Sequence, residues 1–368
     1  MEHLFTPKIK ELLKKYFSED SEKIFEKSYL IQYLNLKTRS AAKGSKSRSS
    51  FANLYAIFVV LEDYVKKGYI ENRNYMDYEG ALYSNLLSRQ RELPFGEKLQ
   101  NHSLNNRLNS EFQKYFHMTN QVPIMRNLET SRYWINENLL IIDIDGKKIN
   151  VAEVVLEIIL EYSKTKQNAF DLFVKNCEEL QKIKEQDSEK IKNFILELLA
   201  PKSDARLFEI VSYSILKYHY IDQKIYWGFS IESINQENLK LFKTGRTNAN
   251  DGGIDFVMKP LGRFFQVTET LDFKKYFLDI DKIQKYPITF VIKSNQPINV
   301  LKKQIEQNAE KIYPVRSILN KYLECIEEII NIPILTDFFI KAIEKDLIND
   351  ILNEIVNQSK LEFNYNFE

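Results

Sequence analysis

Three oxygen-bearing side chains in the second half of the chain could together hold a divalent metal ion. Asp255 lies in the sequence DGGIDF, Gln266 in FFQVT, and Glu209 in the helical stretch RLFEIV. Hard cations such as Mg²⁺ prefer carboxylate and amide oxygens, usually from one or two carboxylates together with water and substrate phosphate. Glu209 alone is typical of a helix-surface carboxylate, but in combination the three residues indicate a magnesium site.

Two short strands and a turn are expected to bring Asp255 and Gln266 together. Ile254 to Met258 and Arg263 to Thr268 are predicted strands, and a proline and a glycine suit the turn at Lys259 to Gly262. Side chains alternate between the two faces of a strand. If the strands pair through this turn, Asp255 and Gln266 lie near each other at one end of the sheet.

The elements around this hairpin alternate between helix and strand. Helical spacing covers Leu207 to Tyr218, and Phe273 to Lys285 forms an amphipathic helix. Ile225 to Ile231 is rich in aromatic and β-forming residues, and Pro287 to Lys293 is an apolar run suited to a central strand. The order predicts a mixed sheet flanked by helices, followed by a chain that is helical from Val300 to its end.

The first half of the chain is predicted to be mainly helical. Together with the mixed sheet of the second half, this predicts an α+β or α/β fold class. Apolar residues follow helical spacing, apart from a hairpin between Leu139 and Val151 with an Asp145-Gly146 turn. Pro201 breaks the helical pattern and places a domain boundary at Leu199 to Ser203. The predicted domains are a helical region (1–200), a mixed-sheet core (201–300) and a helical C-terminal segment (301–368) that packs on the core or at a dimer interface.

The order of these motifs resembles the nuclease core of the PD-(D/E)XK superfamily. A helix with FEIV is followed by DGGIDF, a short hairpin and FFQVT, which is most similar to the Mrr-type branch with Gln in place of the second acid. The resemblance covers Asp204 to Lys293. A nuclease core with helical additions resembles a type II restriction endonuclease, which implies Mg²⁺-dependent phosphodiester hydrolysis that leaves 5′-phosphates.

The resemblance assigns roles to individual residues. Asp255 would be the central metal ligand, Gln266 would replace the usual Glu, and Glu209 would contact the metal through water. Ile254 stands where the motif name has proline, a departure of little consequence. The family's lysine two residues after Gln266, which orients or activates the attacking water, is Thr268 in this chain.

Several groups could compensate for the absent lysine. Glu269 could act as a base, although strand alternation directs it away from Gln266 unless a bulge intervenes. The metal itself could generate hydroxide by lowering the pKa of its water, and an inactive core also stays open. The candidates for a migrated cation are Lys243, Lys259, Lys274 and Lys275.

Two segments carry side chains suited to DNA. Lys37 to Ser50 is interpreted either as a solvated loop or as a segment that contacts phosphates. Before Asp251, Arg and Asn residues alternate; these can make bidentate contacts to guanine and adenine edges, although Asn-rich loops are also plain turns. The predicted DNA-binding residues are Lys37, Arg39, Lys43, Lys46, Arg48, Arg246, Asn248 and Asn250.

The overall composition excludes a histone-like protein, because 52 Lys and Arg face 51 Asp and Glu for a net charge of +1. Residues 1–150 and 201–300 sum to about +5 and +3, and the remaining segments are acidic, so the positive regions are expected to meet DNA. Two distant cysteines favour a reducing cytoplasm without a disulfide framework or zinc site. The absence of a signal peptide or a long apolar stretch excludes a membrane partner. Trp134 and Trp227 are expected in the core, although Trp227 could border the sheet.

The leading hypothesis is a type II restriction endonuclease that cuts double-stranded DNA at a short specific site with Mg²⁺. A homodimer is expected if that site is palindromic, since protein symmetry then matches DNA symmetry. A cognate DNA methyltransferase would be encoded nearby without being bound. The alternatives are a DNA-binding or defence-scaffold protein with an inactive nuclease core, which Thr268 favours, and a nuclease of structured RNA.

Overall fold

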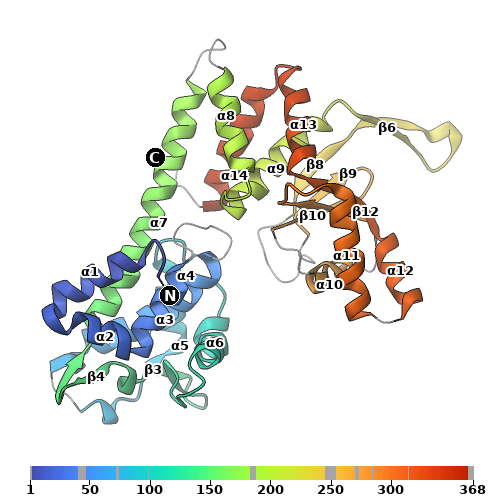
Figure 1. Cartoon of the computed structure of the whole chain (residues 1–368). Coiled ribbons are helices and arrows are strands. Elements are labelled where there is room, and N and C mark those ends of the chain that lie inside the picture. Colours follow the sequence, from blue (N-terminus) through green and yellow to red (C-terminus); the bar gives the residue numbers. More distant parts are fainter. Residues whose placement is uncertain are drawn as a thin grey trace. The chain divides into compact units, whose positions relative to one another are not determined.

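The computed structural model describes residues 2–39, 47–71, 74–97, 99–182, 188–244, 254–269, 273–283, 286–313 and 315–363. The chain divides into two compact units, residues 1–173 and 174–368 (Figure 1). The division falls inside the helix α7 (Ala152–Gln181), whereas the break at Pro201 had suggested a boundary at Leu199 to Ser203. The reason is packing, since α8 (Ser188–Leu199) lies against α9 (Ala205–His219) within the second unit.

The first unit is built around one buried helix, α4 (Ser47–Lys66). Every residue from Phe51 to Leu61 is buried, because the sequence FANLYAIFVVL is apolar on all sides except at Asn53. The other helices of this unit are α1 (Thr6–Phe17), α2 (Ser21–Lys27), α3 (Tyr29–Thr38), α5 (Tyr83–Glu92), α6 (Leu108–Tyr115) and the first part of α7. Short helical turns lie at Ser18–Asp20, Tyr69–Glu71, Tyr75–Asp77, Ser103–Arg107 and Glu137–Leu139.

Two small antiparallel sheets complete the first unit. One contains β1 (Ala81–Leu82), β3 (Arg132–Ile135) and β2 (Ile124–Asn127), in that order. The other is the predicted hairpin of β4 (Ile141–Ile144) and β5 (Lys147–Asn150). The turn residues Asp145 and Gly146 have φ of 53° and 86°, as a type I′ turn requires, so the hairpin prediction is confirmed.

A five-stranded mixed sheet forms the centre of the second unit. The first three strands in chain order are antiparallel neighbours, and the last two pair in parallel with the strand before them. From one edge to the other the strands are β12 (Ile326–Asn331), β11 (Ile288–Ile292), β10 (Arg263–Thr268), β9 (Phe256–Lys259) and β8 (Lys240–Lys243). A separate hairpin pairs β6 (Lys224–Trp227) with β7 (Asn235–Asn238).

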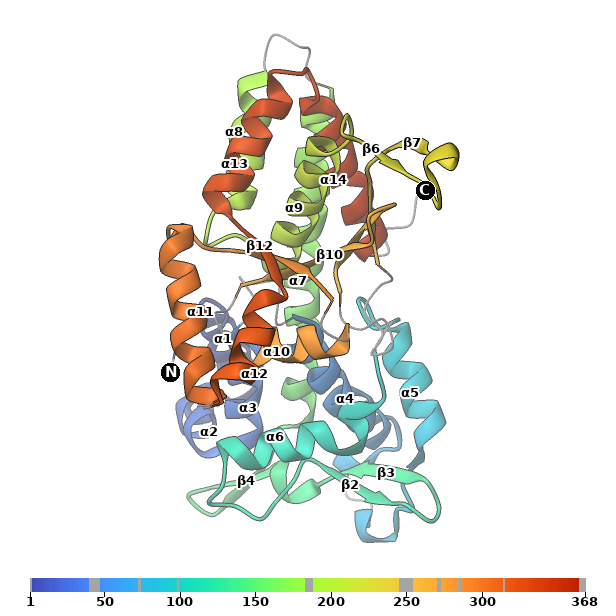
Figure 2. The same cartoon turned by 90° about the vertical axis from the view of Figure 1, so that its right-hand side faces the viewer.

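Helices cover both faces of this sheet (Figure 2). The helix α9 covers one face, where its Tyr213 meets Phe256 and Tyr220, directly after the helix, meets Phe265. That helix also contacts α8, α13 (Ile332–Ile343) and α14 (Ile348–Phe363). The opposite face carries α10 (Phe273–Lys282), α11 (Ile298–Ile312) and α12 (Arg316–Glu324) around a common apolar cluster. The mixed helical and sheet architecture of the fold prediction is confirmed.

The strand β12 corrects one part of the prediction, since the chain is not helical throughout after Val300. The sequence IEEIIN spaces its isoleucines in a way that fits a helix as well as a strand. Parallel pairing with β11 decides between them, because it places Ile329 opposite Phe290 and buries Ile329 and Ile330. None of the helices in the described ranges is long and apolar enough to cross a membrane.

Candidate metal centre

Polar side chains gather at one end of the five-stranded sheet, where β8, β10 and β11 finish and β9 begins. Asp255 directly precedes β9, and Gln266 lies two residues before the end of β10. The N-terminus of α9 is fixed by Asp204, whose carboxylate accepts hydrogen bonds from the amides of Arg206 and Leu207.

Asp255 is held by both neighbouring strands. Its amide donates to the carbonyl of Phe265 at 3.1 Å, and its carbonyl accepts from the amide of Thr244 at 3.0 Å. Its carboxylate Oδ2 accepts from the amide of Val267 at 2.7 Å. The carboxylate thus accepts a hydrogen bond from the backbone of β10, as a backbone carbonyl would if β9 continued. This bond fixes the carboxylate at the end of the sheet.

Gln266 is a buried amide with one unmatched end. Its Nε2 lies 3.5 Å from the carbonyl of Val267, whereas its Oε1 is buried without a hydrogen-bond partner among the described residues. Leaving such an acceptor unpaired costs about 1–3 kcal/mol. The side chains of Asp255 and Gln266 both reach the backbone of Val267, so the structure brings the first two predicted ligands together.

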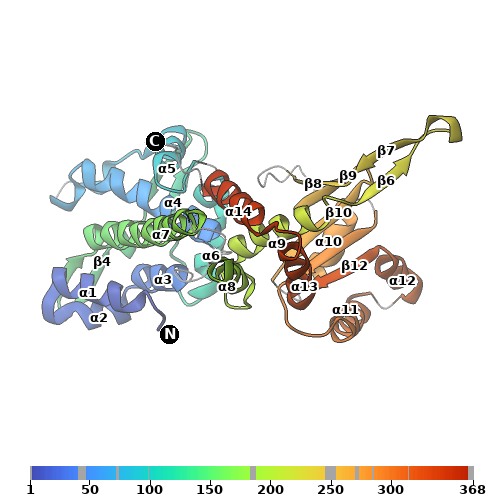
Figure 3. The same cartoon turned by 90° about the horizontal axis from the view of Figure 1, so that it is seen from above.

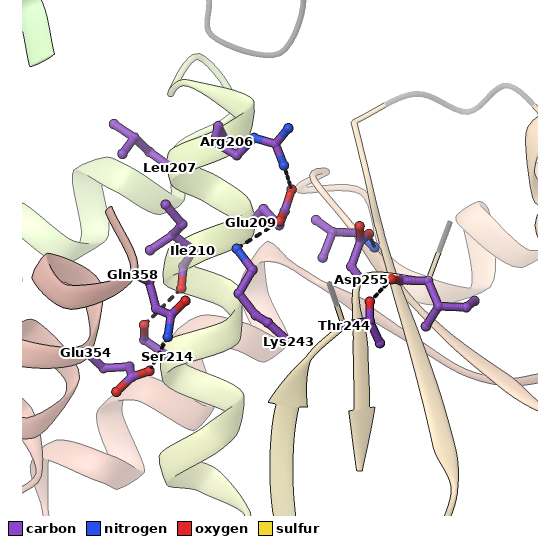
Figure 4. Close-up of polar contacts among 12 residues, drawn as sticks. Arg206, Leu207, Glu209, Ile210, Ser214, Lys243, Thr244, Asp255, Glu354 and Gln358 are labelled. Carbon is purple, nitrogen blue, oxygen red and sulfur yellow. Dashed lines mark hydrogen bonds and ion pairs between the residues drawn. The ribbon is translucent and has the colours of Figure 1, made fainter. Parts of the chain in front are cut away.

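Glu209 reaches the same end of the sheet from α9, but its carboxylate is bound by two cations. Arg206 donates from Nη1 to Oε2 at 2.8 Å, and Lys243 approaches Oε1 with Nζ at 3.2 Å. Figure 4 shows Lys243 reaching to Glu209 while the adjacent Thr244 is bonded to the chain at Asp255. Glu209 is therefore connected to Asp255 through the end of β8, with Lys243 between them.

The residues after Gln266 divide between the two faces of the sheet. Thr268 is buried and hydrogen-bonded to the hydroxyl of Tyr276 in α10. Glu269 accepts a hydrogen bond from Lys293 at 2.8 Å, and the same ammonium also donates to the carbonyl of Ser203. No role for Lys293 was predicted from the sequence. Its position directly after an apolar central strand could have indicated a lysine at this end of the sheet.

The other candidate cations lie elsewhere or outside the described side chains. Lys259 ends β9 at the opposite end of the sheet, where its ammonium lies 5.4 Å from the centre of the Phe242 ring. Lys274 and Lys275 fall in the first turn of α10, but their side chains lie outside the described part of the structure.

The predicted DNA-binding residues have different surroundings. Lys37 lies in α3 with only 10% of its side chain exposed, and it donates to Glu111 at 2.7 Å. Arg39 is exposed just after the end of α3. Arg48 falls in the first turn of α4, with its side chain outside the described part. The remaining predictions, Lys43, Lys46, Arg246, Asn248 and Asn250, lie outside the described residues.

In the described ranges, no three or more His, Cys, Asp or Glu side chains are grouped to hold a metal ion. The possible ligand set is therefore the carboxylate of Asp255 and the amide oxygen of Gln266, with Glu209 held behind Lys243. Neither a protein-family model, nor a curated protein, nor a solved structure matches the chain.

Proposed function

We propose that the second unit hydrolyses phosphodiester bonds of double-stranded DNA with bound Mg²⁺, as a type II restriction endonuclease does. The observation that carries the proposal is the buried Oε1 of Gln266, which has no protein donor in the described structure. The side chains of Gln266 and Asp255 lie close together, because both contact the backbone of Val267. A divalent cation would satisfy both oxygens. The element order of α9, three antiparallel strands, α10 and a parallel strand also supports the nuclease-core expectation.

The donor chemistry fits a hard cation. Asp255 and Gln266 would hold the ion with a carboxylate and an amide oxygen, the ligand types that Mg²⁺ prefers. When bound, such an ion supplies stabilisation of phosphate charge and a water of lowered pKa.

The chain's own residues hold the rest of the site in place. The amide of Val267 orients the carboxylate of Asp255, and the contact of Asp255 with Thr244 ties β8 to β9 at that position. Glu209 keeps two cationic side chains, Arg206 and Lys243, at the same end of the sheet. We assign these two residues to phosphate binding, because fixed cations stabilise charge that develops on a transferring phosphoryl group.

DNA contacts outside the site are assigned to the exposed Arg39 and to the predicted residues Lys43, Lys46, Arg48, Arg246, Asn248 and Asn250. Lys37 is left out of this set, since its charge is compensated by Glu111. Neutralising phosphate-contacting cations should weaken binding and flatten its dependence on salt.

Digestion of mixed plasmid and phage DNA with Mg²⁺ tests the proposal. Wild-type protein should give discrete fragments, and Asp255→Ala should reduce cleavage by about 10³-fold or more while circular dichroism stays unchanged. Asp337→Ala, which removes an exposed carboxylate from α13 of the same unit, is the matched control and should cleave normally. Full cleavage by pure Asp255→Ala protein would overturn the assignment.

A second candidate function is DNA binding without cleavage. It is favoured by Glu209, whose two oxygens are both bound by cations, and by Thr268, which is buried against Tyr276 where the family has its lysine. The same digestion separates the two functions. This candidate predicts that the DNA stays uncut at every Mg²⁺ concentration, while a gel-shift assay shows that the protein binds it.

A further inference from the structure

A hairpin extends from the second unit, apart from the five-stranded sheet. We call residues 224–238 the arm: β6 and β7 pair along their length, and a 3₁₀ turn at Ile231–Ser233 lies near the tip (Figures 1 and 3). Two-stranded hairpins are at best marginally stable in water without further packing. Packing against another surface would therefore stabilise the arm.

The arm exposes large apolar side chains. Phe229 is 99% exposed and Ile231 is 85% exposed, and Tyr226, Trp227 and Ile234 each expose more than a third of their surface. Trp227 is thus not the core residue that the sequence suggested. Contiguous exposed apolar patches on a soluble protein mark interaction sites.

The tip presents these side chains on a defined turn. Ser230 and Ser233 form a capping box, each side chain bonding to the backbone of the other. Gly228 packs so closely on the turn that an added Cβ would lie 2.4 Å from the carbonyl oxygen of Ser233. A pre-formed contact surface loses little conformational freedom on binding, which favours association.

The charge of the arm is unsuited to nucleic acid. After Lys224 at its base, its charged side chains are Glu232 and Glu237, both exposed. Glu232 lies in the turn at the tip and Glu237 lies near the base, opposite Ile225, and both carboxylates would repel phosphates. The surface that covers the arm must instead combine apolar area with positive charge.

The second unit itself carries such a surface. In the ladder of β8 and β9, Lys240 pairs with Lys259 and Phe242 pairs with Val257, so these four side chains share one face. Lys240, Phe242 and Lys259 are exposed, as is Leu261 just beyond β9. We call these four exposed residues and Val257 the basic-apolar patch. It lies on β8, β9 and the turn after β9, and β8 has no partner strand on its outer side within the described residues.

We propose that the arm of one copy of this chain lies on the basic-apolar patch of a second copy, and that the same contact made twice closes a two-fold dimer. The exposure of Phe242 and Lys240 shows that the arm of the same chain leaves the patch uncovered. Glu232 and Glu237 would then meet Lys240 and Lys259, while the aromatic tip covers Phe242. Reciprocal contacts of this kind are the usual basis of homodimers.

Analytical ultracentrifugation of the full chain tests the apolar part of the contact. Wild-type protein should sediment as a dimer, and Phe229→Ser with Ile231→Ser should weaken the dimer by about tenfold or more, since exposed aromatic anchors dominate interfaces. Met76→Ser with Met118→Ser removes two similarly exposed apolar residues from the first unit and should change nothing. Because both sets of positions are exposed, unchanged circular dichroism should accompany every variant.

Charge exchange identifies the partner surface. Glu232→Lys with Glu237→Lys, and separately Lys240→Glu with Lys259→Glu, should each weaken the dimer, whereas a protein that carries all four changes should regain it. A monomeric wild type, an unaffected tip variant, or failure of the fourfold variant to recover would overturn the proposal. Sedimentation is measured without DNA and metal, so a negative result here leaves the cleavage test of Asp255→Ala independent.

Discussion

Two buried amide side chains, Asn53 in the first unit and Gln266 in the second, have opposite surroundings. Asn53 donates to the hydroxyl of Tyr33 at 2.8 Å and to Glu111 at 2.9 Å, and it accepts from Ser103 at 2.7 Å. Gln266 has one long contact with the backbone, and its oxygen is unmatched within the described structure.

The contrast separates a structural polar network from a candidate binding site. A buried network in which each member is paired rigidifies the core around it, and Glu111 is paired further with Lys37. An unpaired buried acceptor destabilises the folded protein unless a ligand supplies the missing partner. Mutation of Asn53 should therefore lower the stability of the protein strongly, whereas mutation of Gln266 should change it little.

The largest effect on stability is expected from Asn53→Leu. The change removes three hydrogen bonds, so the hydroxyls of Ser103 and Tyr33 lose this partner and Glu111 keeps only Lys37 among the described residues, which should lower the free energy of unfolding by about 3–4 kcal/mol. Urea denaturation measures this directly. Asn138→Leu, at an exposed position of the same unit, should change the free energy by less than about 0.5 kcal/mol. A loss below about 1 kcal/mol for Asn53→Leu would mean that the network is not structural.

A smaller loss is expected from Lys293→Met in the second unit. Only 2% of the Lys293 side chain is exposed, and its ammonium bonds to Glu269 and to the carbonyl of Ser203. Glu269 can be solvated again in the variant, but the carbonyl loses its donor, so a loss of about 2 kcal/mol is expected. Lys345→Met breaks an exposed pair with Asp222 and serves as the control. Equal stability of both variants would show that the contacts of Lys293, unlike those of Asn53, do not stabilise the fold.

Acid should destabilise the second unit through His219. Burial, together with the charges of Lys341 and Lys345, lowers the pKa of His219 from 6.5 to about 4. The unfolded chain then binds a proton more readily than the folded one, so stability present above pH 6.5 is lost as the pH falls toward 4. Since the ring is only half-buried, the loss is discounted to about 1 kcal/mol between pH 7 and 5.

His219→Phe tests this pH dependence, because phenylalanine can keep the stacking contact with Phe338, at 3.6 Å between ring centres. The difference in unfolding free energy between pH 7 and pH 5 should shrink relative to wild type. Identical pH profiles for the two proteins would contradict the assignment to His219.

The smallest effect on stability is expected from Gln266→Met. The variant removes an unpaired oxygen and one long hydrogen bond, so its unfolding free energy should stay within about 1 kcal/mol of wild type. A loss as large as that of Asn53→Leu would show that Gln266 belongs to a paired structural network and would remove the main support for the metal site.

The sequence predicted much of the local structure of the second unit because its signals there are strong. Arg263 to Thr268 is the strand β10 with the predicted bounds, and α9 lies within two residues of its expected start. By contrast, β7 has the sequence NQEN, which lacks apolar residues, and only its pairing with β6 makes it a strand. Likewise, isoleucine spacing alone could not distinguish β12 from a helix.

The candidate site was predictable to the extent that it depends on neighbouring strands. Alternation and the turn before Arg263 were enough to place Asp255 beside Gln266. The pairing of Glu209 with Lys243 depends on how α9 packs against β8, and the position of Lys293 depends on parallel pairing of β11 with β10. Such contacts between distant segments have no local signal in the sequence.

Calorimetric titration of Mg²⁺ into wild type, Gln266→Met and Asp255→Ala, with Asp337→Ala as the control, tests the metal site most directly. We expect wild type and the control to bind the ion, and both site variants to bind it at least about tenfold more weakly, because each loses one of two oxygen ligands. Binding by Gln266→Met that equals wild type, or no binding by wild type, would contradict the assignment of the unpaired oxygen to a metal ion.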